Sequence, residues 1–226
     1  MNPRNRTWAL VAILVVAAVL RVGWISRGDT MSDEVFYGFR AVGPMDFDEA
    51  AEQTTPLEWF DGHIPWWTHL SFSDHPPLVF WVQHVFIALF GENNFGLRFP
   101  SALFGIASVY LLYLLGRQLF GERVGLLAAA LFAVTTNSVY ISRLGMQEAY
   151  VIFFLLLGSY WFLRALDDRR YWWGVGAAVG LGFLTKYTAL ILVPIFLTYL
   201  LVFRRDCFRQ KAPWGGMLVA LALASP

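Results

Sequence analysis

The chain has 226 residues, of which 58% are hydrophobic, 17% aromatic and only 15% charged, and its mean hydropathy is +0.53. This composition is too apolar for a soluble domain and indicates a membrane protein with several spans. The formal net charge is +1, and no basic run is long enough to predict nucleic-acid binding. The single cysteine, Cys207, cannot form a disulfide within the chain.

Apolar runs in chain order predict an all-α polytopic membrane protein with about seven spans in a single module. The first run exceeds the usual apolar length of a signal peptide and lacks a small-residue cleavage site, which favours a retained helix. Residues 171–203 would form one helix about 50 Å long, so we expect two shorter spans that turn near Lys186. The predicted spans are 8–25, 99–116, 124–140, 146–163, 171–186, 188–203 and 212–226.

The chain stops inside the last apolar run, at Pro226. We therefore expect residues 1–226 to be the N-terminal part of a longer protein, truncated at its C-terminus. The glycines between Gly174 and Gly182 are expected to allow close helix packing, because no strand precedes them as a dinucleotide fingerprint requires.

A long polar loop, residues 26–98, separates the first span from the others and holds most of the acidic residues. Within it, residues 76–90 would form a helix of only about 22 Å, too short to cross a bilayer comfortably, so we expect an interfacial helix. Ser73 or Asp74 is its expected N-cap, and the following prolines suit a first turn.

The distribution of Lys and Arg predicts the orientation, because short cytoplasmic loops collect basic residues. Residues 117–123, 164–170 and 204–211, with Arg4 and Arg6, hold 11 of the 17 basic residues. We therefore expect a cytoplasmic N-terminus and an extracytoplasmic acidic loop.

Three isolated cations, Arg98, Arg143 and Lys186, are predicted at the same membrane face as the acidic loop. Each alone is consistent with an interfacial anchor. Together, guanidinium and ammonium groups suit a phosphate or pyrophosphate at the membrane surface. A lipid-linked phosphate fits that description.

The loop supplies two pairs of candidate acid–base groups, Asp33-Glu34 and Asp74-His75. On an irregular segment only one of two adjacent acids need point at a substrate, and a carboxylate near apolar surface can accept a hydroxyl proton. Solvated surface residues are the plain alternative. A divalent cation bound by these four side chains stays open, although their spacing is not that of an obvious metal site.

Five motifs in order are similar to those of the GT-C glycosyltransferases of family 39, which include protein O-mannosyltransferases and the aminoarabinose transferases that modify lipid A. The resemblance covers nearly the whole chain. The motifs are Ser32-Asp33-Glu34 with Tyr37, His75-Pro76-Pro77-Leu78 with Trp81, Gly91-Glu92-Asn93 to Ala102, Ser142-Arg143, and Gly182-Phe183-Leu184-Thr185-Lys186.

The resemblance implies a GT-C-type helical bundle whose first extracytoplasmic loop contains interfacial helices, and an enzyme that uses a polyprenyl-phosphate-linked sugar. It assigns the catalytic acid to Asp33 and its companion to Glu34, and it directs Lys186 at the donor phosphate. Arg98 and Arg143 match basic positions at outer helix ends, and Glu148 matches an acid near the site.

Two positions depart from the aminoarabinose-transferring members. Those proteins have a Glu-Lys pair before the two prolines and an Arg before the tyrosine of the first motif, whereas this chain has Asp74-His75 and Phe36. Two phosphate-facing cations are therefore missing, and His75 matches the mannosyltransferase branch. A neutral hexose donor is favoured.

The expected reaction is an inverting displacement on the extracytoplasmic side of a bacterial or archaeal plasma membrane. Asp33 would take the proton of an acceptor hydroxyl on a lipid, glycan or protein, and Arg98, Arg143 and Lys186 would stabilise the departing polyprenyl phosphate. The alternatives are a membrane transporter or lipid-linked sugar flippase, and a non-catalytic membrane subunit. Transporters more often carry inverted repeats and acids within their spans, and the sequence has neither.

Overall fold

The computed structural model describes residues 2–31, 33–42 and 75–224 of the chain. Within these residues all regular structure is helical, which confirms the predicted all-α fold. The helices are α1 (Pro3–Val22), α2 (Asp33–Val42), α5 (Leu78–Phe90), α6 (Asn94–Phe120), α7 (Glu122–Val134), α8 (Thr136–Ser142), α9 (Glu148–Ala165), α10 (Tyr171–Phe183), α11 (Leu192–Phe203) and α12 (Lys211–Ala224), with 3-10 helices η2 (Tyr187–Ile191) and η3 (Arg205–Arg209) on either side of α11.

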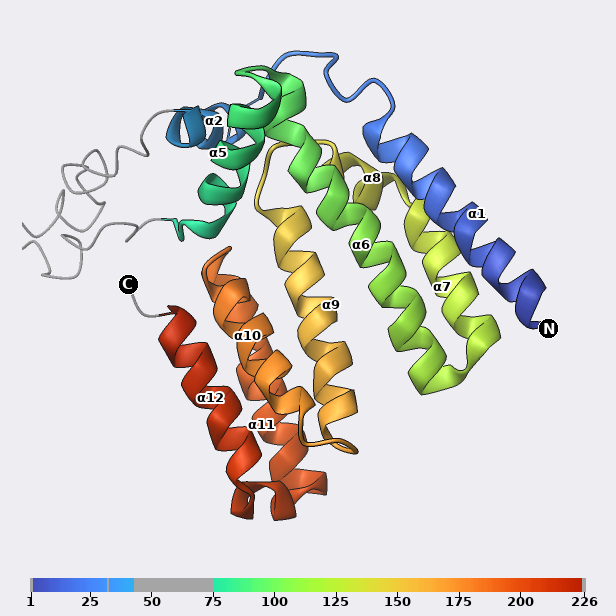
Figure 1. Cartoon of the computed structure of the whole chain (residues 1–226), viewed down its shortest axis with the longest axis vertical. Helices are drawn as coiled ribbons and strands as arrows, with labels where there is room; N and C mark the ends of the chain where they lie inside the picture. The colour runs from blue at the N-terminus through green and yellow to red at the C-terminus, as the bar shows by residue number, and fades with distance from the viewer. Residues whose placement is uncertain (1, 32, 43–74, 225–226) are drawn as a thin grey trace, which may run out of the picture.

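The helices form two groups that meet along α6 and α9 (Figure 1). In the first group α1, α6 and α7 pack together around Ala17, Val109 and Ala129. In the second, α9 to α12 surround a core that includes Phe162 and Phe196, whose rings stack with centroids 4.1 Å apart. The short helices α2 and α5 lie together at one end of the bundle, against the beginning of α6 (Figure 1).

Three helices are long and apolar enough to cross a membrane, namely Arg4–Val22, Asn94–Phe120 and Glu148–Ala165. A fourth crossing is formed if α7 and α8 count as one span, which is bent by 63°. Thr135 separates the two halves, and its hydroxyl donates a hydrogen bond to the Leu131 carbonyl, a contact that competes with helix continuation. The remaining apolar helices are shorter, so the count of seven spans stays a prediction.

The start of the polar loop differs from the expectation. The sequence analysis treats Asp33 and Glu34 as part of an irregular segment, but they are the first two residues of α2, where acidic side chains complement the positive end of the helix dipole. The helix at the end of the loop begins at Leu78 with Pro77 as its N-cap residue and no side-chain cap. The proposed caps, Ser73 and Asp74, lie outside the described residues.

The glycine-rich segment forms α10, which packs closely on α12. A Cβ atom on Gly176 would collide with the Gly216 carbonyl of α12, so only glycine permits this approach. Small residues at a helix–helix contact are typical of membrane proteins.

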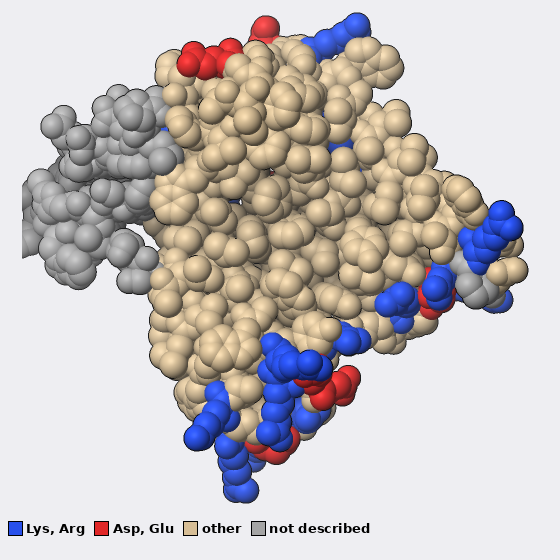
Figure 2. Space-filling view, viewed as in Figure 1, with Lys and Arg blue, Asp and Glu red and all other residues tan. Residues whose placement is uncertain are grey.

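Charge is distributed unevenly over the bundle. Figure 2 shows Lys and Arg side chains gathered along the lower edge and at the lower right, where the connections between α6 and α7, α9 and α10, and α11 and α12 lie in Figure 1. We call this the basic end, and it carries residues 117–123, 164–170 and 204–211. Helices α2 and α5 lie at the opposite end.

Candidate functional site

The site is built around an ion pair between α2 and α6. Arg98 Nε lies 2.6 Å from Glu34 Oε1, and Arg98 Nη2 lies 2.8 Å from Glu34 Oε2, which makes the pair bidentate. The side chains are 4% and 0% exposed. A buried pair of this geometry fixes α2 against the start of α6, because removing either partner would leave an uncompensated charge.

Arg98 uses its remaining donors on the chain segment between α1 and α2. Its Nη1 donates to the carbonyls of Ile25 and Arg27, and Nη2 also donates to the carbonyl of Asp29. With the two bonds to Glu34, all five N–H groups of the guanidinium are occupied. In this structure Arg98 therefore holds residues 25–29 from inside the protein and offers no N–H to a phosphate.

Glu34 also connects α2 to the loop between α8 and α9. Its Oε1 accepts a hydrogen bond of 2.8 Å from the Gly145 amide, and the Gly145 carbonyl accepts one of 2.8 Å from Gln83 Nε2 on α5. A Cβ atom at position 145 would lie 2.7 Å from Leu97 and 3.3 Å from Glu34. Four separate segments are thus locked together at Gly145, and a glycine is needed there.

Asp33 and Glu34 have opposite environments although they are neighbours in sequence. Asp33 is exposed at the N-terminus of α2, whereas Glu34 is fully buried. The His75 ring packs against the same helix, with its centroid 5.6 Å from Phe36 and 5.4 Å from Tyr37. The structure thus brings His75 to the helix that carries Asp33; Asp74 lies outside the described residues.

Lys186 and Glu148 form a second ion pair. Lys186 Nζ lies 2.8 Å from Glu148 Oε1, and both side chains are about one-third exposed. The other oxygen, Glu148 Oε2, is buried and has no hydrogen-bond partner among the described residues. Lys186 is the N-cap residue of the 3-10 helix η2, at the break between α10 and α11.

One backbone hydrogen bond joins this pair to the rest of the site. The Leu78 amide, at the start of α5, donates to the Leu184 carbonyl at 2.9 Å, two residues before Lys186. The His75-Pro76-Pro77-Leu78 motif therefore lies beside the Leu184-Thr185-Lys186 motif. Helix α5 therefore links the Lys186 ammonium to the His75 imidazole and to the first turn of α2.

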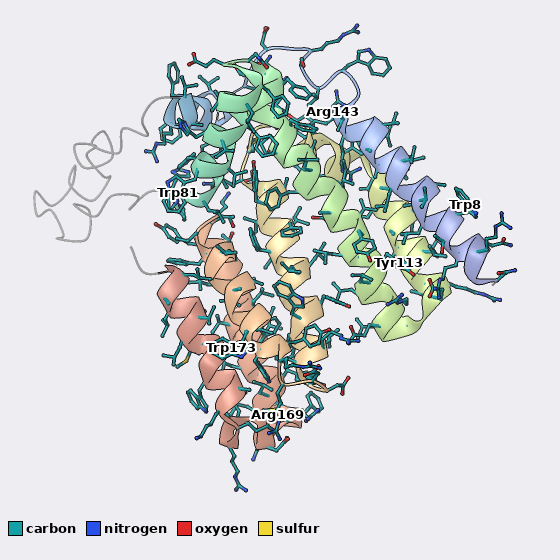
Figure 3. All side chains as sticks on the ribbon, viewed as in Figure 1. Trp8, Trp81, Tyr113, Arg143, Arg169 and Trp173 are labelled. Carbon is teal, nitrogen blue, oxygen red and sulfur yellow. The ribbon has the colours of Figure 1, made fainter. Side chains whose placement is uncertain are left out.

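Arg143 lies at the same end of the bundle as α2 and far from Arg169 at the basic end (Figure 3). Its Nη1 donates to the carbonyls of Leu20 and Gly23 at 2.7 Å each. A cation at the C-terminus of α1 satisfies carbonyls that lack a helical partner and complements the helix dipole. The hydrogen bonds of Arg143 are thus to α1, not to the Glu148–Lys186 pair.

Sequence reasoning missed several polar residues of this region. Arg21, Gln83 and Gln147 are each fully buried, and Gln147 has no side-chain hydrogen bond within the described residues. Arg21 is a lone cation in an apolar run, the same signal that singled out Lys186. Gln83 and Gln147 stand out less, because single amides are common near helix ends.

The described residues hold no group of three or more His, Cys, Asp or Glu side chains that could ligate a metal ion. Asp33, Glu34 and His75 belong to the described part of the chain, and Asp74 does not.

Known proteins resemble the chain in sequence and in fold. The family model described as dolichyl-phosphate-mannose-protein mannosyltransferase matches residues 74–226. YycA of Bacillus subtilis (strain 168) has been assigned as a mannosyltransferase by inference. It is 34% identical to this chain over 226 residues, which cover 99% of this chain and 31% of YycA. The chain thus spans about a third of the length of this relative.

Two solved structures share the fold. The Saccharomyces cerevisiae protein O-mannosyltransferase Pmt1-Pmt2 complex, bound to its sugar donor, matches with a TM-score of 0.68 at 22% identity, over 99% of this chain and 32% of that one. ArnT from Cupriavidus metallidurans, bound to undecaprenyl phosphate, matches with a TM-score of 0.68 at 20% identity, over 100% of this chain and 41% of that one. The fold predicted from the motifs, a GT-C-type bundle, is confirmed.

The matched region begins at residue 74 and includes His75, Arg98, Arg143, Glu148 and Lys186, while the similarity to YycA extends over Asp33 and Glu34 as well. On both grounds the chain belongs to the dolichyl-phosphate-mannose-protein mannosyltransferase family of GT-C membrane proteins.

Proposed function

We propose that the protein transfers a sugar from a polyprenyl-phosphate donor to a hydroxyl acceptor by inverting displacement, at the end of the bundle formed by α2, α5 and the break before η2. The observation that carries the proposal is that an exposed carboxylate, Asp33, and a partly exposed ammonium, Lys186, belong to two segments that α5 and His75 join. A base and a phosphate-binding cation are the two groups that such a transfer needs.

Asp33 is the proposed base. It is exposed, so an acceptor hydroxyl can reach its carboxylate, whereas Glu34 is enclosed by Arg98 and Gly145. In the proposed step Asp33 takes the hydroxyl proton while the acceptor oxygen forms a bond to the anomeric carbon. The bond from that carbon to the phosphate oxygen breaks, and the electron pair leaves with the polyprenyl phosphate.

Lys186 is the proposed partner of the departing phosphate. An ammonium has three donors, and among the described residues only Glu148 Oε1 takes one, so two are available to phosphate oxygens. Negative charge grows on the leaving phosphate in the transition state, and a cation held in place beforehand stabilises that charge without reorganisation. Glu148 is thus a positioning residue that holds Lys186.

Arg98 takes a different proposed role from the contact with the departing phosphate that the sequence analysis expects, whereas Arg143 keeps that role. The bonds of Arg98 to Glu34 and to three carbonyls make it a positioning residue for α2 and hence for Asp33. Arg143 has Nη2 and Nε beyond its two bonds to α1, so we keep it as a candidate phosphate ligand.

The test is the replacement Asp33→Asn in the full-length protein. The assay measures transfer of mannose from a polyprenyl-phosphate mannose donor to a hydroxyl acceptor. Loss of a general base is expected to lower kcat by about 10²–10⁴-fold. The matched control is Glu92→Gln, which removes an exposed acid from the turn between α5 and α6. Transfer that survives in Asp33→Asn at the wild-type rate would contradict the proposal, as would an equal loss in Glu92→Gln.

A further inference from the structure

The short helix α5 contacts both segments that carry the ion pair of Lys186 and Glu148. Its first residue, Leu78, donates from its amide to the Leu184 carbonyl at 2.9 Å, two residues before Lys186. Its second contact, made by Gln83, is with the loop that leads into Glu148 at the start of α9. One helix is thus bonded to the segment of the lysine and to the segment of the glutamate.

The Gln83 contact is a hydrogen bond of defined direction. Gln83 Nε2 lies 2.8 Å from the Gly145 carbonyl oxygen. A carbonyl can only accept, so the nitrogen of the amide, and not its oxygen, must face Gly145. The Gly145 amide donates in turn to Glu34 at 2.8 Å. Gln83 and Glu34 therefore hold the peptide groups on either side of one glycine, and Glu148 follows three residues later.

Gln83 is a polar residue on a buried face of α5 that is otherwise apolar. Val79, Gln83 and Ile87 recur every four residues and are 0%, 0% and 5% exposed. Val79 packs against Ala149 and Tyr150 in the first turn of α9. A buried amide destabilises such a face unless it is hydrogen-bonded, so apolar packing alone does not account for a glutamine at this position.

We propose that Gln83 is a positioning residue for the donor phosphate, because it fixes the loop that sets Glu148 and, through Glu148, the Lys186 ammonium. This role rests on the proposed function, in which the ammonium receives the departing phosphate. Glu148 and Lys186 are each about one-third exposed, so burial does not lock either side chain. The hydrogen bonds from α5 to both segments supply the rigidity that a preorganised cation requires.

The first variant, Gln83→Met, keeps the length of the side chain but cannot donate to Gly145. In the full-length protein we expect KM for a polyprenyl-phosphate mannose donor to rise about fivefold, the factor that corresponds to one hydrogen bond between neutral groups. The kcat value should change less, since the Lys186 ammonium is still present, and KM for the acceptor should stay unchanged. The matched control is Gln147→Met, because Gln147 is equally buried but has no side-chain hydrogen bond within the described residues.

A second variant, Gln83→Glu, makes the same hydrogen bond depend on pH. A protonated carboxyl can donate to the Gly145 carbonyl, whereas an ionised one can only accept. Glu34 and Arg98, beyond Gly145, are paired with each other, so burial decides and raises the pKa of a carboxyl at this position. The ratio of donor KM between Gln83→Glu and the wild type should be near one at low pH and should rise at high pH at least to that of Gln83→Met. A loss of packing alone would give a ratio that does not depend on pH.

Hydrogen exchange gives a readout that needs no sugar donor. In Gln83→Met the backbone amides of residues 144–146 should exchange faster than in the wild type, because one of the two bonds that hold Gly145 is lost, and Gln147→Met should not show this change. Unchanged exchange or an unchanged donor KM in Gln83→Met would overturn the role of Gln83, as would an equal rise of donor KM in Gln147→Met or a ratio for Gln83→Glu that does not depend on pH. The last comparison also decides if Gln83→Met does not fold. A wild-type protein without transfer activity would instead contradict the proposed function, and the exchange result would still show whether Gln83 holds the loop.

Discussion

At the scale of single residues, the adjacent acids Asp33 and Glu34 have different environments because their side chains point in different directions from the same helix. Successive side chains on an α-helix point about 100° apart, so when α2 packs Glu34 against Arg98, Asp33 must face elsewhere. The sequence identifies the pair but not which member is buried, since that depends on the helical phase of a segment that we expected to be irregular.

The buried pair should matter mainly for stability. Replacing Arg98 by Ala leaves the Glu34 carboxylate buried with only backbone donors, and breaking a buried pair costs about 3–5 kcal/mol. We expect a lower free energy of unfolding by that amount, measured by denaturant titration in detergent micelles. The control is Arg170→Ala, which breaks an exposed pair with Asp168 and should have no measurable effect. Equal stability of the two variants would refute the structural role of Arg98.

The two lysines of the chain offer a matched comparison of charge at the two ends. Lys186→Gln should lower kcat/KM for sugar transfer by about 10²–10³-fold, because a preorganised cation beside the leaving phosphate is lost. Lys211→Gln, at the start of α12, should leave it unchanged. Glu148→Gln should cause a smaller loss that shows in KM for the donor more than in kcat, since the ammonium stays but is held less firmly.

At the scale of elements, the long apolar helices were predictable from the sequence. Of their two interruptions, the break before η2 was predictable and the bend at Thr135 was not. The break before η2 follows from length, because residues 171–203 exceed the hydrocarbon thickness, and the structure ends α10 at Phe183 and begins η2 at Tyr187. The sequence around the bend at Thr135 contains no proline or glycine that would predict it. Arg21 of α1 donates hydrogen bonds on both sides of the bend, a tertiary contact that a pattern within one run cannot reveal.

Arg21 should stabilise the bent span formed by α7 and α8. Its guanidinium donates to the carbonyls of Phe132 and Ala133 beside the bend and, at 2.7 Å, to the Ser138 hydroxyl beyond it. Arg21→Met would leave buried carbonyls unpaired, each at a cost of about 1–3 kcal/mol. We expect a lower free energy of unfolding and a longer distance between spin labels at positions 127 and 140, which are both exposed.

Arg27, which is exposed and stacked on Trp24, is the control for this substitution. Arg27→Met should change neither the free energy of unfolding nor the distance between the labels. An unchanged distance in Arg21→Met would show that the bend persists without the buried guanidinium, and the bend would then belong to the local sequence around Thr135.

At the scale of the whole molecule, the motifs converge because the helices return to the same end. Glu34, His75, Glu148 and Lys186 are far apart in sequence, yet all lie in segments joined through α5 and the Gly145 loop. Counting the membrane crossings between the motifs predicts this convergence, since each motif lies at the end of a span on the same side. The count does not show which side chains pair within the site, and for that reason Arg98 was expected at the phosphate.

The separation of charge between the ends predicts how the bundle lies in the membrane. Basic residues mark the cytoplasmic side of short loops, so we expect the basic end inside and the end with α2 and α5 outside. Single cysteines placed in a Cys207→Ala background at Gln118 and Glu92 test this, because both positions are exposed and lie at opposite ends of α6 and its preceding turn. In intact cells a membrane-impermeant maleimide should label Glu92→Cys and should label Gln118→Cys only after permeabilisation. The reverse pattern would place Asp33 and Lys186 in the cytoplasm and exclude an extracytoplasmic acceptor.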